Sequence, residues 1–177
     1  MKTLIITAAL LGVLLMQTGA NDDINVSNQG NIGGDVHQTV NINNQDNIAN
    51  INDFNGWDSW DSICDYKRGL FATRLFSKKA CVVTRMNKAV FPTLAQLSKA
   101  VQEKKASGDA PPPRQVTYAV IHTPVKDVND FGSHIESLCR GLPTYSAAET
   151  QGSELFSGYG DCSSSSIITI LGITMCW

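Results

Sequence analysis

The sequence lacks the short motifs that mark common catalytic and phosphate-binding sites. It contains no Gly-x-Ser-x-Gly, no His-Glu-x-x-His, no phosphate-binding glycine loop and no Cys-x-x-Cys. Its histidines, His37, His122 and His134, are scattered without the spacing of metal ligands, which is more typical of surface histidines. We therefore expect a protein that is not an enzyme and that uses no metal or cofactor.

The sequence also lacks an apolar run long enough to cross a bilayer. The run Leu4–Met16 falls short of the about 20 residues that a membrane helix needs. Lys2 precedes this run and Thr18-Gly19-Ala20 follows it. Together they predict a secretory signal peptide over residues 1–20 and an extracellular protein with no membrane span.

An excess of basic charge is lacking as well. Without the signal peptide the chain has 13 basic and 16 acidic residues, a formal net charge of −3, which predicts no attraction to nucleic acid or to anionic membranes. The exception is the stretch from Lys67 to Lys88, which holds seven basic residues and no acid. This basic run suits either a solvated sheet with charged turns or a site for sulfated or sialylated glycans.

The five cysteines are an odd number, so one is left over if the others form disulfides in an oxidising compartment. Choosing the odd cysteine and pairing the rest allows 15 arrangements, and the spacing does not choose among them. The five are Cys64, Cys81, Cys139, Cys162 and Cys176.

Residues 63–86 predict three short strands in series. Branched and aromatic residues fill Ile63–Tyr66, Leu70–Phe76 and Cys81–Met86, and the charged residues gather at the bends between them. Asp65 is unusual because aspartate is disfavoured in a strand. Its buried carboxylate would be costly unless a base or a backbone N–H pairs with it.

Two helices and a fourth strand follow in the pattern. Pro92 to Lys105 is predicted as a helix, and Gln115–Ile121 as a strand. Asp127 is expected to cap a second helix that ends at Gly141. The apolar residues of that second helix share one face, and they are Val128, Phe131, Ile135 and Leu138.

Residues 21–55 are rich in asparagine, and two interpretations stay open for them. One is a solvated, disordered leader, because the segment has few apolar residues. The other is a pair of short hairpins with Asn-rich turns that extends a sheet. Asn25 begins the glycosylation sequon Asn25-Val26-Ser27. Further on, Trp57 and Trp60 suit either a core edge or a sugar-stacking platform, and the core is the commoner use.

Several of these segments resemble the BRICHOS domain, and the whole layout resembles the gastrokines, most closely the gastrokine-1 type. The resemblance covers the chain from Trp57 to the C-terminus. It rests on Asp65-Tyr66, Ala80-Cys81-Val82-Val83 with Met86, Phe91-Pro92-Thr93-Leu94, the stretch from Leu138 to Tyr145, Gly56–Trp60 and Pro111–Pro113.

The resemblance implies an α+β fold, with an antiparallel sheet, two helices on its opposite faces, and a β-hairpin-like C-terminal tail. It implies the disulfides Cys81–Cys139 and Cys162–Cys176, which leaves Cys64 as a shielded or intermolecular thiol. It also places Asp65 at the family's aspartate position, where the carboxylate could act as a switch whose protonation holds the compact state. The predicted units are residues 1–20 (signal peptide), 21–55 (Asn-rich segment), 56–150 (BRICHOS domain) and 151–177 (β-prone tail).

The implied function is that of a secreted factor of the gastric mucosa, which supports epithelial maintenance, growth and barrier integrity. Its expected act is to bind β-prone client polypeptides and prevent their aggregation. Further candidate partners are a mucin, a trefoil peptide, a glycan at the basic run, and a second copy of the chain through Cys64. An alternative is a precursor that releases a signalling peptide near Lys104-Lys105.

The tail contains the most aggregation-prone window of the chain, Ser166–Met175, which is apolar, branched and uncharged. An exposed edge of this kind recruits other chains. We therefore expect the tail to pair along the sheet of its own domain by strand addition.

Overall fold

The computed structural model describes residues 22–28, 36–54, 56–107, 116–150 and 173–177. The predicted signal peptide, Cys162 and most of the tail lie outside these residues. Among the helices of the described ranges, none combines the length and the apolar character of a membrane span.

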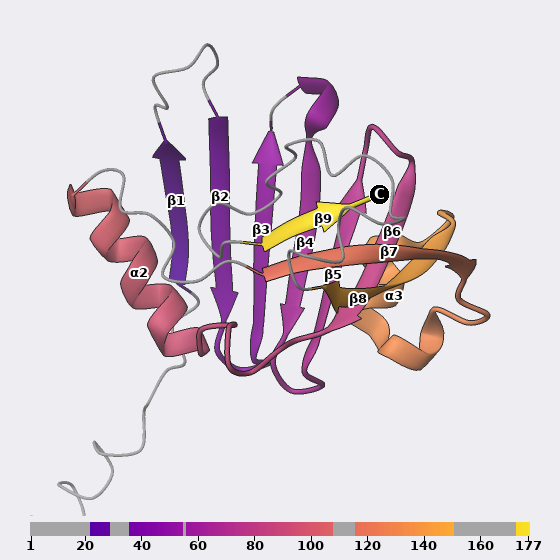
Figure 1. The fold of residues 1–177 in the computed structure, drawn as a ribbon. Coiled ribbons are helices and arrows are strands. Elements are labelled where there is room, and N and C mark those ends of the chain that lie inside the picture. The colour runs from indigo at the N-terminus through magenta and orange to yellow at the C-terminus, as the bar shows by residue number, and fades with distance from the viewer. Residues whose placement is uncertain (1–21, 29–35, 55, 108–115, 151–172) are drawn as a thin grey trace, which may run out of the picture.

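The described strands form a single mixed sheet of nine, in the order β1-β2-β3-β4-β5-β6-β8-β7-β9 (Figure 1). Neighbouring strands are antiparallel except in the pairs β6–β8 and β7–β9, which are parallel. The strands are β1 (Asp22–Asn28), β2 (Val36–Asn43), β3 (Ile48–Phe54), β4 (Trp60–Asp65), β5 (Leu70–Leu75), β6 (Ala80–Arg85), β7 (Val116–Pro124), β8 (Thr144–Thr150) and β9 (Ile173–Cys176).

The Asn-rich segment supplies the first three strands, so the hairpin interpretation holds for its described part. β1 pairs with β2, and β2 with β3, in continuous antiparallel register. Val40, Ile42 and Ile51 are buried, which explains how so few apolar residues attach these strands to the core. Asn25 lies in β1 opposite Thr39, and its glycosylation remains a prediction.

The three predicted central strands are confirmed as β4, β5 and β6, which form an antiparallel meander. Four-residue turns join β2 to β3, β4 to β5, and β5 to β6. The last residue of each turn has a left-handed backbone: Asn47 (φ 56°), Gly69 (φ 66°) and Lys79 (φ 49°). Asn and Gly are the residues that adopt this conformation readily, so Lys79 is the unfavourable one of the three.

The two helices cover opposite faces of the sheet, as expected. Leu97 and Val101 of α2 (Leu94–Ser107) belong to the larger buried cluster, together with Phe71 and Val82. Ile135 and Cys139 of α3 (Ser133–Cys139) belong to a second cluster. That second cluster also contains Ala72, Cys81 and Val83. These residues are next to Phe71 and Val82 in β5 and β6, and successive side chains of a strand point to opposite faces.

The sheet curls over the α2 face. In Figure 1, β7 and β9 cross in front of β3, β4 and β5. Side chains of the crossing strands, Tyr118 and Met175 among them, lie in the same buried cluster as Ile51 and Phe71. The core is therefore enclosed between two parts of one sheet, and α2 covers the part near β1 and β2.

The second predicted helix is interrupted, which corrects the expectation of one continuous helix from Asp127. A short 3-10 helix, η2 (Asn129–Phe131), precedes α3, and Gly132 separates the two with φ 91°. The Asp127 carboxylate accepts a hydrogen bond from the Asn129 N–H at 2.9 Å but caps neither helix. The expected apolar face is nevertheless present, since Val128, Phe131, Ile135 and Leu138 share the second cluster.

A disulfide joins Cys81 at the start of β6 to Cys139 at the end of α3, across 58 positions of sequence. Closing a loop of this length contributes about 4 kcal/mol on the chain-entropy model. Both sulfurs lie in the second cluster, so the bond fixes α3 to its face of the sheet.

The end of the tail pairs with its own domain. β9 runs parallel to β7, with Ile173 opposite Val116 and Cys176 opposite Ala119. Ile173, Met175 and Cys176 are buried. Cys176 is disulfide-bonded, but the predicted partner Cys162 lies outside the described residues, so that pairing remains a prediction.

Candidate functional site

The sheet divides where β6 and β8 part. The two strands pair in parallel only from Cys81–Thr144 to Val83–Ser146. Beyond that point β6 continues beside β5 as far as Arg85, while β8 continues beside β7 as far as Thr150. We call this opening between Thr84–Asn87 and Ala147–Glu149 the fork.

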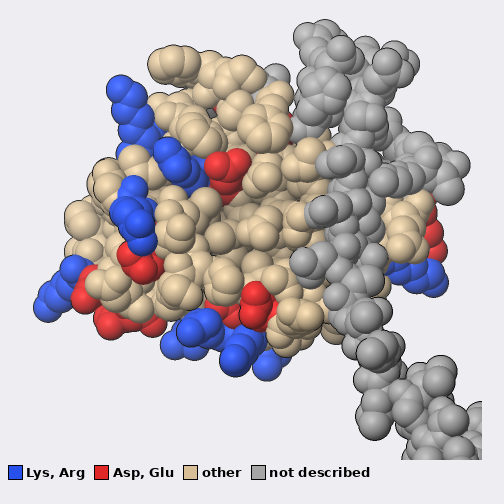
Figure 2. All heavy atoms as spheres, turned by 180° about the vertical axis from the view of Figure 1, so that it is seen from behind, with Lys and Arg blue, Asp and Glu red and all other residues tan. Residues whose placement is uncertain are grey.

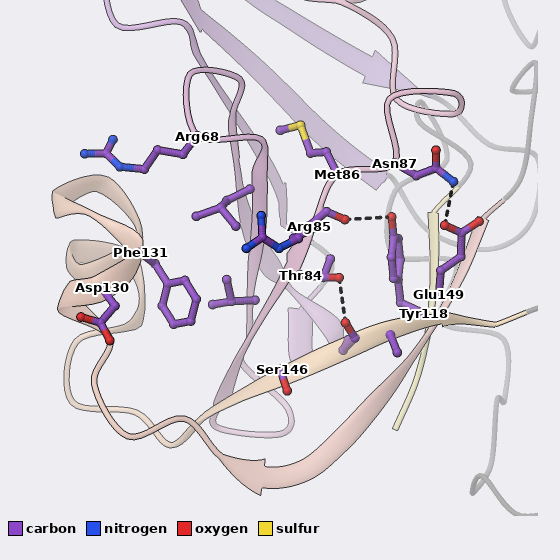
Figure 3. A pocket seen from close by; sticks show the side chains of 14 residues that line it. Arg68, Thr84, Arg85, Met86, Asn87, Tyr118, Asp130, Phe131, Ser146 and Glu149 are labelled. Atoms are coloured by element: carbon purple, nitrogen blue, oxygen red, sulfur yellow. Dashed lines mark hydrogen bonds between the residues drawn. The ribbon is translucent and has the colours of Figure 1, made fainter.

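Three side-chain hydrogen bonds bridge the fork (Figure 3). The Thr84 hydroxyl donates to the Ala147 carbonyl at 2.8 Å. The Tyr118 hydroxyl, from β7, donates to the Arg85 carbonyl at 3.4 Å. At the mouth, the Asn87 amide donates to the Glu149 carboxylate at 2.7 Å. Side chains thus hold the two strands together where main-chain pairing has ended.

A pocket of about 1030 Å³ opens at the fork. Its walls come from both buried clusters: Phe131, Leu70 and Val83 belong to the α3 side, whereas Tyr118 and Ala147 belong to the α2 side. In Figure 3 the Phe131 ring projects from η2 toward the β6 side chains. The pocket therefore offers apolar contact on both faces of the sheet and strand edges between them.

Burial raises the pKa of Tyr118 to about 12. Its hydroxyl is therefore a neutral hydrogen-bond donor throughout the physiological range. Thr84 is also buried. The two inner bridges of the fork are part-buried and line the pocket, whereas the Asn87–Glu149 bond is exposed.

Asp65 lies beside this pocket and is paired. Its side chain is 1% exposed, and its Oδ2 accepts from the Arg68 guanidinium Nη1 at 3.0 Å. Its Oδ1 accepts from the Arg68 backbone N–H at 2.9 Å. A buried carboxylate is costly without a base or a backbone N–H to pair with, and Asp65 has both. These contacts favour a structural role for Asp65, and the proposed switch remains a prediction.

Arg68 also connects the β4–β5 turn to the helices above it. Arg68 is among the residues that line the pocket, and its guanidinium lies against Gly132, where an added Cβ would come within 2.6 Å of Arg68 Cζ. The break between η2 and α3 therefore makes room for Arg68. Asp65, Arg68 and Gly132 form one contact chain from the sheet to the helix pair.

Cys64 is a free thiol at the centre of the core, with 0% exposure. Burial raises its pKa to about 12, which makes it unreactive as a nucleophile. Of the two predicted states, the shielded thiol fits this position.

Comparison with known proteins identifies the family. The model of the BRICHOS domain matches residues 56–146. Human gastrokine-1 (Homo sapiens) is 45% identical over 99% of this chain and 97% of its own. Mouse gastrokine-1 (Mus musculus) is 43% identical over 99% of this chain and 96% of its own. Rat gastrokine-2 (Rattus norvegicus) is 36% identical over 99% of this chain and 97% of its own.

The chain belongs to the gastrokine family. No solved structure matches it.

The basic run does not form one surface in this gastrokine. Arg85 lies opposite Leu70, at the end of the sheet where the β4–β5 turn carries Lys67 and Arg68. Lys78 and Lys79 occupy the β5–β6 turn, at the other end of the same strands. Figure 2 shows blue and red groups interspersed on the face in view. The arrangement matches charged turns rather than one continuous anion site.

The remaining candidate residues lie away from the fork. Trp60 is buried, as expected for a core residue, whereas Trp57 in η1 (Gly56–Asp58) is 78% exposed. Lys104 and Lys105 lie within α2. Among the described residues, no group of three potential metal ligands comes together.

Sequence reasoning missed the fork and its bridges. Thr84, Asn87, Tyr118 and Glu149 are far apart in the sequence and form no motif. A local signal was available elsewhere, since Thr93-x-x-Gln96 is a capping box. The Gln96 Oε1 accepts from the Thr93 N–H at 2.9 Å, and the Gln96 N–H donates to the Thr93 hydroxyl at 3.3 Å.

Proposed function

We propose that this gastrokine is a secreted, non-enzymatic factor of the gastric mucosa that supports epithelial maintenance, growth and barrier integrity. Its molecular act is to bind β-prone segments of other polypeptides and to prevent their aggregation. Family membership supports the setting. The molecular act rests on the pocket at the fork.

The single observation that carries this proposal is a large pocket at an interruption of a β-sheet. The unpaired edge of a strand carries main-chain groups that can pair with an extended peptide. The pocket adds apolar walls from Phe131, Leu70 and Val83, which suit uncharged client side chains. Its polar groups hold the strands together by hydrogen bonds, an arrangement suited to binding rather than to a reaction.

A charge placed in the pocket tests this proposal. Ala148 is exposed and lines the pocket, so Ala148→Glu alters the site without entering the core. We expect the full chain to slow thioflavin-detected fibril growth of an unrelated amyloid peptide, and Ala148→Glu to slow it at least threefold less. The matched control is Ala100→Glu, at an exposed position on α2. No delay by the full chain, or equal delay by both variants, would reject the proposal.

The other candidate functions have weaker support. A glycan-binding module would need the basic run in one place, and its members lie at both ends of the sheet. A peptide precursor would need cleavage at Lys104-Lys105, which lie within a helix, whereas proteases prefer exposed loops. An intermolecular disulfide with a trefoil peptide or a second copy would require the core to open at Cys64.

A further inference from the structure

The hydrogen bonds of the main chain along β6 show which residues direct their N–H and carbonyl groups toward the fork. The Cys81 N–H donates to the Pro143 carbonyl, on the β8 side, at 2.9 Å. The Met86 N–H donates to the Gly69 carbonyl, on the opposite side, at 2.9 Å. Successive residues of a strand direct their main-chain groups to alternate sides. Arg85, four residues after Cys81, therefore presents its N–H and carbonyl to the fork.

The bridges of the fork occupy positions that a strand would use. The Arg85 carbonyl receives the Tyr118 hydroxyl, and the Ala147 carbonyl receives the Thr84 hydroxyl. Both acceptors are main-chain groups of strands that have separated from their parallel partner. The two hydroxyls thus take the places of main-chain N–H donors.

We propose that an extended, uncharged segment of another polypeptide inserts between β6 and β8 at the fork, pairing with both strand edges and displacing the Thr84 and Tyr118 hydroxyls. This inference rests on the proposed function and specifies its site and mode. Because β6 and β8 run in the same direction, a segment running the opposite way pairs antiparallel with both. That pairing is the stronger kind of ladder.

The walls of the fork specify the side chains of the segment. Residues of an inserted strand point alternately to the two faces of the sheet. One face meets Phe131 and Leu70, and the other meets Tyr118 and Met86. A strand that is apolar on both sides reads as a continuous run of valine and isoleucine rather than an alternating one. The preferred client is therefore a β-branched segment without charges.

N-methylated peptides distinguish insertion from other modes of binding. The probe is a capped heptapeptide of valine and threonine, used unmodified, N-methylated at odd positions, or N-methylated at even positions. An inserted peptide donates its N–H groups alternately to the β6 edge and the β8 edge, so we expect the unmodified peptide to bind the full chain and each methylated form to bind at least tenfold more weakly. Loss with only one methylated form indicates addition at an outer edge. Equal binding of all three indicates docking by side chains, and no binding at all leaves the fork without a ligand. Each of these three results overturns the inference.

A substitution at Thr84 is the second test of insertion. Thr84→Val leaves the Ala147 carbonyl free for an incoming N–H, so we expect the affinity for the unmodified peptide to rise about three- to tenfold. The control is Thr73→Val, which removes another buried hydroxyl, bonded to Ser62 at 2.8 Å in the meander, and should leave the affinity unchanged. Unchanged or lower affinity for Thr84→Val would refute insertion. Delayed fibril growth with a failed peptide test rejects the insertion mode alone, whereas absence of any delay rejects the proposed function itself.

Discussion

The Gly132 backbone and the Arg68 guanidinium lie in direct contact. A Cβ built at Gly132 would come within 2.6 Å of both Cζ and Nε of Arg68. Gly132 also has φ 91°, a value that residues with a side chain rarely adopt. The backbone conformation therefore requires glycine at this position, and the Arg68 contact also favours it.

Comparing two glycines separates those constraints. Gly141 has a similar φ of 76°, but an added Cβ meets nothing within 4 Å. We expect Gly141→Ala to lower the free energy of unfolding by about 1 kcal/mol from backbone strain alone. Gly132→Ala should lower it by at least about 1 kcal/mol more, because its ψ of 164° adds backbone strain and the Arg68 contact adds to it. Urea denaturation measures both. In an Arg68→Ala background the difference should shrink but not vanish, because Gly132, with φ 91° and ψ 164°, lies in a backbone region that is almost exclusive to glycine. An unchanged difference would contradict the assigned contact.

The Asp65–Arg68 pair makes a second prediction. Asp65→Asn keeps the shape but removes the charge that the guanidinium and the backbone N–H stabilise. We expect the free energy of unfolding to fall by about 1–2 kcal/mol. The loss is limited because Arg68 is 44% exposed, so water can solvate its guanidinium when the carboxylate is absent. A double-mutant cycle with Arg68→Gln measures the coupling. An Asn variant as stable as the parent would instead support the protonation switch.

Asp53 makes a prediction about pH. Burial raises its pKa, and the hydrogen bond from the Gln38 amide, at 2.9 Å, only partly offsets this. The folded state therefore favours the protonated carboxyl. Its contribution to stability is fully present below the pKa of the unfolded chain, about 4, and is lost as the pH rises through the higher folded-state pKa. Asp61 shifts in the same direction, through burial opposed by Arg74.

The measurement is the melting temperature between pH 3 and pH 7. Asp53→Asn copies the uncharged form, so its melting temperature should rise relative to that of the parent as the pH increases over this range. Asp58→Asn, at an exposed position, should follow the parent curve. An unchanged slope for Asp53→Asn would show that this carboxyl does not couple to folding.

The buried Cys64 thiol should be invisible to reagents in the native state. With 0% exposure and a pKa of about 12, it should react with iodoacetamide only as fast as the core opens. The mass shift of one label should appear only when denaturant unfolds the chain. Non-reducing electrophoresis of Cys64→Ala should match the parent, and loss of a dimer band in that variant would show that the thiol forms an intermolecular bond.

Local sequence patterns predicted the central strands and their turns, and the BRICHOS resemblance supplied the opposite placement of the helices. Branched and aromatic residues in 63–86, with charged residues at the bends, predicted β4, β5 and β6. This pattern succeeded because each strand is buried on at least one face and each turn is polar. Positions of apolar residues predicted that Val128, Phe131, Ile135 and Leu138 share a face, which they do. The BRICHOS resemblance supplied the Cys81–Cys139 bond, which five cysteines alone left open among 15 arrangements.

The tertiary structure decided what depends on contacts between distant segments. The helix expected after Asp127 breaks at Gly132, whose φ of 91° is not helical, and Arg68, 64 positions earlier, lies against this residue. The sequence indicated that Asp65 needs a basic or N–H partner, but only the fold of the β4–β5 turn shows that this partner is Arg68. The fork arises because β6 follows β5 while β8 follows β7, a divergence of curled strands that no local pattern encodes.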